Sequence, residues 1–320
     1  MLKIILPASR VASGLIGLCV GDALGVPVEG SSRAERMRTP VTGMYSRDIY
    51  NMWDQPPGTW SDDSSLTFCL AESLCKGFSL AAIAESFCRW YYRNAWTARG
   101  RVFDIGITTQ AAIERLYRGV SPAEAGDSVE RNDGNGSLMR ILPLAYCHKT
   151  LDFNTLIQRV HQVSCLTHAH LHAQIACGIY ISIATCLLEG VEPKTAYFKG
   201  LRNLEHIYRQ APYYSELIHF ERVLGKEIAT LPEKVVRSGN SAIDTLESAL
   251  WCLLNSSSYP EAVLKAVNLG GDADTTAAVT GGLAGIYYGI HNIPPEWIEA
   301  IANKEAIINL ATRLEAAIYR

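Results

Sequence analysis

Two short acidic clusters each place carboxylates and a hydroxyl at the start of a predicted helix. The first precedes a helix predicted over residues 64–76, and the second precedes an apolar helix predicted over residues 275–288. One aspartate at such a position is typical of a helix N-cap. Capping needs only one carboxylate, and paired carboxylates repel one another, so we predict cations there. Oxygen ligands without Cys or His favour Mg²⁺ or Mn²⁺. The side chains concerned are Ser61, Asp62 and Asp63 in the first cluster, and Asp272, Asp274 and Thr275 in the second.

A third candidate follows an N-terminal helix that is rich in small residues. Glu29 lies just past Gly25 and Pro27, where the chain leaves this helix, so its carboxylate can point into a cleft. A plain surface position is the alternative for Glu29. Asp22, inside the helix, fits a polar group satisfied by close helix packing.

A glycine-rich loop and a histidine segment are candidates for binding a ligand. In residues 132–140, Gly134 and Gly136 expose backbone N–H groups that can hold a phosphate, although an ordinary turn has the same composition. His168, His170 and His172 alternate, as zinc ligands on a strand would. The sequence after them is helical, where alternate residues do not share a face. We therefore favour one histidine contacting a ligand over a zinc site.

Two more specific sequence motifs also match the second acidic cluster, and we reject both. Residues 272–276 fit the D-x-D-x-T nucleophile motif of haloacid-dehalogenase-type phosphatases, yet that motif ends a buried strand, and this segment follows a predicted helix. The D-x-D motif of metal-binding glycosyltransferases needs a nucleotide-binding α/β sheet, and we find no alternation of strands and helices.

The elements that carry these residues are predicted to be almost entirely helical. Apolar residues recur with the helical period, and no alternating strand pattern of useful length occurs. We predict an all-α fold forming one domain over residues 1–320, with long polar loops at 38–60 and 126–137 that suit a functional site. Further helices are predicted over residues 80–91, 151–163, 169–188, 196–209, 242–254, 260–268 and 299–318.

Composition narrows the class of protein. Hydrophobic residues make up 48% and charged residues 19%, which supports a large core, and the net charge of −3 argues against general nucleic-acid binding. We find no charge-free run of 18 or more apolar residues, and therefore expect no membrane span. Pro7 and Arg10 interrupt the first apolar run, so we expect no targeting segment. Nine cysteines without C-x-x-C spacing indicate free thiols and a cytoplasmic location.

Taken together, the motifs resemble the ADP-ribosylglycohydrolase family, which includes the dinitrogenase-reductase-activating glycohydrolases. The resemblance rests on five segments in order: GLCVGDALGVPVEG, GTWSDDSSL, NDGNGSLMR, THAH and NLGGDADTTAAVTGGLAG. It implies an all-α fold with a binuclear Mg²⁺ or Mn²⁺ centre, held by the two acidic clusters, with Glu29 beside the metals. It also implies that His168 lies near a diphosphate. The residues implied to line the ADP-ribose site are Asn132, Asn135, Gly136 and Ser137.

The resemblance implies a hydrolase that releases ADP-ribose from a modified protein side chain. Glu29 or Asp62 would assist proton transfer, and the favoured linkage is N-glycosidic ADP-ribosyl-arginine. Residues 38–58 and 193–240 would shape the acceptor side. Hydrolysis of a serine-linked or small-molecule ADP-ribose derivative is an alternative. So is a non-catalytic immunity protein that blocks an ADP-ribosyltransferase by contact, and a third is a metal-dependent phosphohydrolase.

Overall fold

The computed structural model describes residues 9–45, 53–129, 133–225 and 227–319. Over these residues the chain forms helices and no strand, with two isolated β-bridges, Asp127–His168 and Gly134–Ser241. The predicted all-α class is therefore confirmed. The α-helices are α1 (Arg10–Gly25), α2 (Arg33–Arg38), α3 (Asp62–Leu74), α4 (Leu80–Arg93), α5 (Ile107–Tyr117), α6 (Phe153–Ser164), α7 (Leu171–Leu188), α8 (Pro193–Tyr208), α9 (Glu221–Leu224), α10 (Ala242–Leu254), α11 (Tyr259–Asn268), α12 (Ala273–Tyr288), α13 (Pro295–Ala300) and α14 (Lys304–Ile318).

Most predicted helices lie close to their observed bounds, and the C-terminal one is the exception. The segment 299–318 was predicted as a single helix, but α13 ends at Ala300 and α14 begins at Lys304. Between them Asn303 has a left-handed backbone, with φ 57°. Its side-chain amide donates to the carbonyls of Thr97 and Ala98. Contacts with a distant segment therefore set this break, and a local pattern does not encode them.

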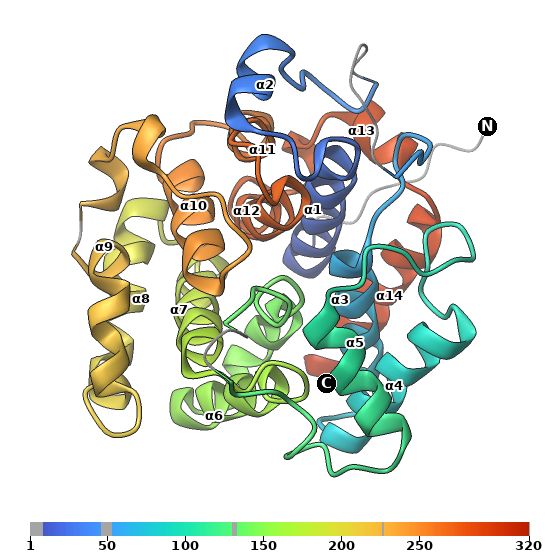
Figure 1. The fold of residues 1–320 in the computed structure, drawn as a ribbon, viewed down its shortest axis with the longest axis vertical. Coiled ribbons are helices and arrows are strands. Elements are labelled where there is room, and N and C mark those ends of the chain that lie inside the picture. The colour runs from blue at the N-terminus through green and yellow to red at the C-terminus, as the bar shows by residue number, and fades with distance from the viewer. Residues whose placement is uncertain (1–8, 46–52, 130–132, 226, 320) are drawn as a thin grey trace.

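Helices α1 and α12 pack against each other at the centre of the fold, with α3, α4 and α5 to one side and α7, α8 and α10 to the other (Figure 1). Small residues allow this close approach. A Cβ on Gly21 of α1 would lie 2.1 Å from the carbonyl oxygen of Ala277 in α12. Aspartates at the C-terminal end of α1 and the N-terminal end of α12 are thereby brought together.

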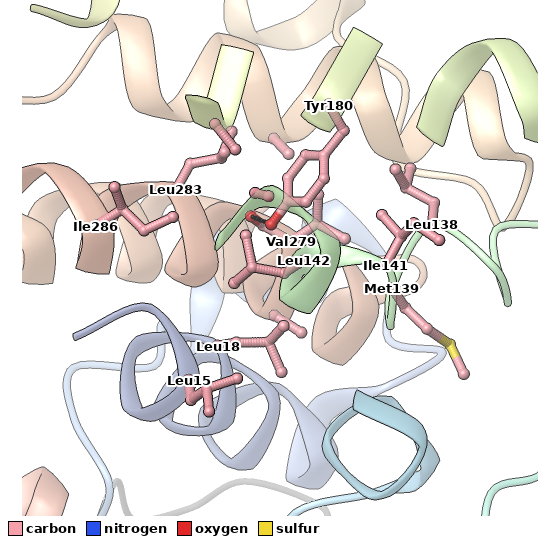
Figure 2. Packing of buried hydrophobic residues seen from close by; sticks show 14 of the residues in the cluster. Leu15, Leu18, Leu138, Met139, Ile141, Leu142, Tyr180, Val279, Leu283 and Ile286 are labelled. Carbon is pink, nitrogen blue, oxygen red and sulfur yellow. Dashed lines mark hydrogen bonds between the residues drawn. The ribbon is translucent and has the colours of Figure 1, made fainter. Parts of the chain in front are cut away.

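Around this pair the core is filled by apolar side chains from several helices. Figure 2 shows Leu15 and Leu18 of α1 facing Leu283 and Ile286 of α12, with Tyr180 of α7 above them. The Tyr180 hydroxyl donates to the carbonyl oxygen of Val279, at 3.2 Å. All of these side chains are buried, so they fix the helices that carry the acidic clusters.

Two helical segments are long and apolar enough to cross a membrane by length and composition alone. They are residues 10–28 and α7. The segment 171–188 contains no Asp, Glu, Lys or Arg, so the expectation that no uncharged stretch of this length exists is wrong there. Within the fold, 94% of the first segment and 83% of the second are buried. Burial to this extent is typical of apolar helices in a protein core.

Candidate active site

The two acidic clusters meet at one cleft of about 1030 Å³. Its walls come from residues 29–30 after α1, the start of α3, the loop before α5 with the start of α5, the segments 133–136 and 238–240, and the start of α12. Most of the predicted site residues lie on these walls. Those that line the cleft are Glu29, Asp62, Asn135, Gly136, His168, Asp272 and Thr275.

The first acidic cluster lies in the first turn of α3, which begins two residues earlier than predicted. Ser61 is its N-cap, and its Oγ accepts from the backbone N–H of Asp63. Asp22 of α1 accepts from the backbone N–H groups of Ser61 and Ser64 and from the Ser64 hydroxyl. Asp22 and Ser61 therefore supply the capping, which leaves Asp62 and Asp63 available for another role.

The second acidic cluster is positioned by two glycines that precede α12. Gly270 and Gly271 have φ values of 70° and 73°, and a Cβ on Gly271 would lie 2.0 Å from the carbonyl oxygen of Ser238. The backbone N–H of Gly30 donates to the Gly271 carbonyl oxygen, which brings the segment of Glu29 beside the cluster. Only glycine fits this turn, because larger residues are strained at positive φ and would clash here.

Asp272 stands at the N-cap position of α12 but does not cap the helix with its side chain. Instead its Oδ2 accepts from the side-chain amide of Asn135, at 2.7 Å, and the same amide donates to the Thr245 hydroxyl, at 2.8 Å. Helix capping is therefore wrong as the explanation for Asp272. Asn135 lies on the cleft wall and holds the carboxylate of Asp272 in place.

Buried carboxylate oxygens without partners occur on Asp63 and Asp274, which are sequence neighbours of cleft-lining residues but are not themselves among them. Oδ1 of Asp63 and Oδ1 of Asp274 are both buried and have no hydrogen-bond partner. Burial raises the pKa of both side chains well above the usual range, and the negative charge of neighbouring carboxylates raises it further. Burial and nearby carboxylates raise the pKa of Asp62 in the same way. A buried charged group is stable only when it is paired or bound to a metal.

None of the ion pairs among the described residues involves an acid of the two clusters. The buried guanidinium of Arg140 donates instead to the carbonyl oxygens of Gly136 and Val163 and to the Thr167 hydroxyl. The clusters thus present a dense set of carboxylate and hydroxyl oxygens without a counter-charge. This donor set fits hard divalent cations.

Glu29 lies at the edge of the cleft, half-buried, and its carboxylate accepts from the indole N–H of Trp53. Asp104 lies beside it, and carboxylate oxygens of Glu29, Asp104 and Asp274 come within 4.8 Å of one another. Burial, followed by the charges of Asp274, Asp62 and Glu29, raises the pKa of Asp104 strongly.

No sequence pattern singled out Asp104, although its side chain belongs to a residue that lines the cleft. It stands in the loop before α5, and in the sequence it lies far from both acidic clusters. Its left-handed backbone, with φ 60°, is uncommon for a residue other than glycine. The available local signal was an aspartate two residues before Gly106, and many surface turns share that pattern.

The other wall of the cleft is formed by the glycine-rich segment and His168. The ring of His168 is buried, and its Nδ1 lies 2.8 Å from the Thr167 hydroxyl oxygen. A Cβ on Gly136 would lie 2.7 Å from Cε1 of His168, so this glycine packs directly on the ring. Burial, and then the charge of Arg140, lowers the pKa of His168 to about 3. His168 is therefore neutral near pH 7 and offers a hydrogen bond, not a positive charge.

The two remaining predicted ligand-binding residues are Ser137 and Asn132. The hydroxyl of Ser137 accepts from the Ser164 hydroxyl and lies 3.5 Å from Sγ of Cys177, inside the core. Ser137 is fully buried and is not among the residues that line the cleft. Asn132 lies outside the described residues.

Comparison with known proteins gives a consistent result. The family model described as ADP-ribosylglycohydrolase matches residues 5–320. The chain is 31% identical to "ADP-ribosylarginine hydrolase Tri1" of Serratia proteamaculans (strain 568), over 95% of this chain and 78% of that protein. It is 30% identical to "ADP-ribosyl-[dinitrogen reductase] glycohydrolase" of Rhodospirillum rubrum, over 92% of this chain and 91% of that protein.

Solved structures agree with the sequence comparison. A structure titled "ADP-ribosylglycohydrolase-related protein complex" superimposes with a TM-score of 0.78 and 32% identity, over 97% of this chain and 98% of the other. The fold, the family model and the relatives all support the resemblance drawn from the five motifs. The chain belongs to the ADP-ribosylglycohydrolase family.

Proposed function

We propose that this protein is a metal-dependent hydrolase that removes ADP-ribose from modified arginine side chains. The observation that carries the proposal is the convergence of the two acidic clusters on one cleft, with buried, unpartnered oxygens on Asp63 and Asp274. Relatives named as ADP-ribosylarginine hydrolases, from Serratia proteamaculans and Pseudomonas putida, support arginine as the acceptor.

Two divalent cations, Mg²⁺ or Mn²⁺, fit the donor set of the cleft. Ser61, Asp62 and Asp63 would hold them from the start of α3, and Asp272, Asp274 and Thr275 from the start of α12. The Thr275 hydroxyl already lies 3.4 Å from Oδ2 of Asp63, so the two helix ends face each other. When bound, such a pair of cations supplies Lewis acidity that orients a substrate and activates a water.

The side chains around this centre can carry the proton transfers. Hydrolysis at the anomeric carbon of a ribose passes through an oxocarbenium-like state, which nearby carboxylates stabilise. Glu29 is held by Trp53 at the cleft edge and Asp62 lies on the cleft wall, so either carboxylate can accept a proton from the attacking water. Asp104 lies next to Glu29 and is a further candidate for delivering a proton to the departing guanidine.

The opposite wall suits a diphosphate. Gly134, Asn135, Gly136 and His168 line the cleft, and the backbone N–H of Asn135 already donates to the carbonyl oxygen of Asn240. Main-chain N–H groups of a glycine-rich segment are well suited to anions. We therefore place the diphosphate of ADP-ribose against residues 134–136, with the distal ribose toward the acidic clusters.

The test is hydrolysis of an arginine-ADP-ribosylated protein with Mg²⁺ or Mn²⁺, and again with EDTA. We expect release of free ADP-ribose that requires the cation and is abolished in Asp62→Asn. Glu247→Gln is the matched control, because Glu247 is a buried acid paired with Arg222 outside the cleft. Release that persists in EDTA would refute the metal-dependent mechanism. Binding of ADP-ribose without any release would favour a serine-linked or small-molecule substrate, or a binding protein.

A further inference from the structure

A second group of metal-binding side chains lies apart from the acidic clusters. His172 is in the first turn of α7, and Glu216 and His219 belong to the 3₁₀ helix η4 (Tyr214–Phe220). One ligand atom from each of the three side chains lies within 4.8 Å of the others. Nε2 of His172 is 3.1 Å from Oε2 of Glu216. One of the alternating histidines, His172, therefore has partners that lie more than 40 residues further along the chain.

The geometry of η4 explains why its two residues face the same way. Side chains three positions apart nearly eclipse each other in a 3₁₀ helix, so Glu216 and His219 project from one side. That side is turned toward α7, because the ring centroids of His172 and His219 are 4.8 Å apart. An α-helical turn would have separated the two side chains more widely around the axis.

The other nitrogen of His172 gives an independent observation. Nδ1 is buried and makes no hydrogen bond, and it lies 3.6 Å from Oδ2 of Asp133. A neutral imidazole carries one proton, so it can donate to only one of the two carboxylates that flank it. If Nδ1–H faces Asp133, the lone pair of Nε2 faces the carboxylate of Glu216. A cation between Nε2 and Glu216 relieves this repulsion.

The same arrangement is common around metal-bound histidines. A histidine that binds a metal through one nitrogen usually donates its other N–H to a carboxylate, which fixes the ring. Asp133 occupies that position here. Two imidazoles and one carboxylate suit Zn²⁺, in contrast to the all-oxygen donor set of the cleft.

We propose that His172, Glu216 and His219 form a separate site for one Zn²⁺ ion, with Asp133 as the carboxylate that orients His172. This site does not depend on the proposed hydrolase activity. It would nevertheless touch the cleft, because Asp133 lines it and its carbonyl oxygen accepts from the backbone N–H of Ala242. Bound zinc would tie α7 and η4 to the segment that forms one wall of the cleft.

The test is equilibrium dialysis of the full chain against Zn²⁺ in excess Mg²⁺, with the bound zinc quantified by elemental analysis. Mg²⁺ competes for oxygen ligands and poorly for imidazole. We expect His219→Gln to bind one zinc equivalent fewer than the wild-type chain. His219 is exposed, so this variant should fold. His291→Gln replaces another exposed histidine and should bind zinc as the wild type does.

Two further measurements distinguish zinc from a simple ionic contact. Asp133→Asn should weaken zinc binding about 10–100-fold, as expected for loss of the carboxylate behind a histidine ligand. Co²⁺ as a spectroscopic probe should give visible absorption typical of nitrogen ligation in the wild type and in His291→Gln, and this absorption should be lost in His219→Gln. Equal zinc stoichiometry in His219→Gln and the wild type would overturn the proposal.

Discussion

Replacing Asp63 with asparagine should raise the stability of the metal-free protein and reduce its stabilisation by divalent cations. Oδ2 of Asp63 accepts from the hydroxyls of Ser61 and Thr275, and an asparagine carbonyl oxygen can keep both contacts. The amide group would take the place of Oδ1, which is buried without a partner. It would face the carboxylate of Asp274, whose charge is the largest contribution from any neighbouring group to the raised pKa of Asp63.

The size of both effects follows from general energetics. An amide hydrogen bond to a carboxylate contributes about 1.5–3 kcal/mol. The entropy of unfolding is about 2.1 cal/mol/K per residue, or about 0.67 kcal/mol/K for this chain of 320 residues, so Tm in EDTA should rise by about 2–4 °C. A cation at about 100 times its Kd contributes about 2.7 kcal/mol. Two cations should therefore raise the Tm of the wild type by about 8 °C, and that of Asp63→Asn by about half as much or less.

The assay is a thermal melt at constant pH in EDTA and in increasing Mn²⁺. Glu247→Gln is the control, because it also removes a buried carboxylate but leaves the cleft intact. Its response to Mn²⁺ should match that of the wild type. Lower stability of Asp63→Asn than of the wild type in EDTA, or equal stabilisation of both proteins by Mn²⁺, would contradict a metal-binding role for the unpartnered oxygen of Asp63.

Four further outcomes are expected. Gly21→Ala should lower the free energy of unfolding by about 1–3 kcal/mol in urea titrations, because its Cβ would lie 2.1 Å from the carbonyl oxygen of Ala277; unchanged stability would contradict the close packing. Burial raises the pKa of Asp22 from 3.8 to about 6, so its stabilisation is present below the unfolded-state pKa and is lost as pH rises through 6. In melts of the metal-free protein, the free energy of unfolding should fall by about 3 kcal/mol between pH 4 and pH 6, and it should fall by less in Asp22→Asn. Asp104→Asn should lower kcat about 10²–10⁴-fold in the ADP-ribose release assay, and wild-type turnover would exclude Asp104 from proton transfer. Ser137→Ala should leave the calorimetric Kd for ADP-ribose unchanged, since the hydroxyl points into the core, and weaker binding would show that it contacts the ligand.

The acidic clusters could be located from the sequence because their signal is local. A hydroxyl and two carboxylates stand directly before an apolar helix in each case, and the helix starts themselves follow the capping preferences of serine and aspartate. The small residues of α1 likewise predicted close helix packing, which Gly21 and Ala277 show. The alternative of plain capping at Asp272 was removed only by seeing its side chain bound to Asn135.

Other features depend on contacts between distant segments and left no local pattern. Asp104 joins Glu29 and Asp274 although 75 residues separate it from the first and 170 from the second. The break between α13 and α14 is held by the contacts of Asn303 with Thr97 and Ala98.

Local patterns in the sequence were enough to predict the helical class, the family and seven of the residues that line the cleft, because helical periodicity, helix starts and ordered motifs are properties of short segments. Tertiary structure alone decided which carboxylates lack partners, which way Ser137 points, and that His172 meets Glu216 and His219. The physical reason is that burial, charge and ligand geometry depend on the side chains that surround a residue. Packing of the helices brings those side chains together from distant parts of the chain.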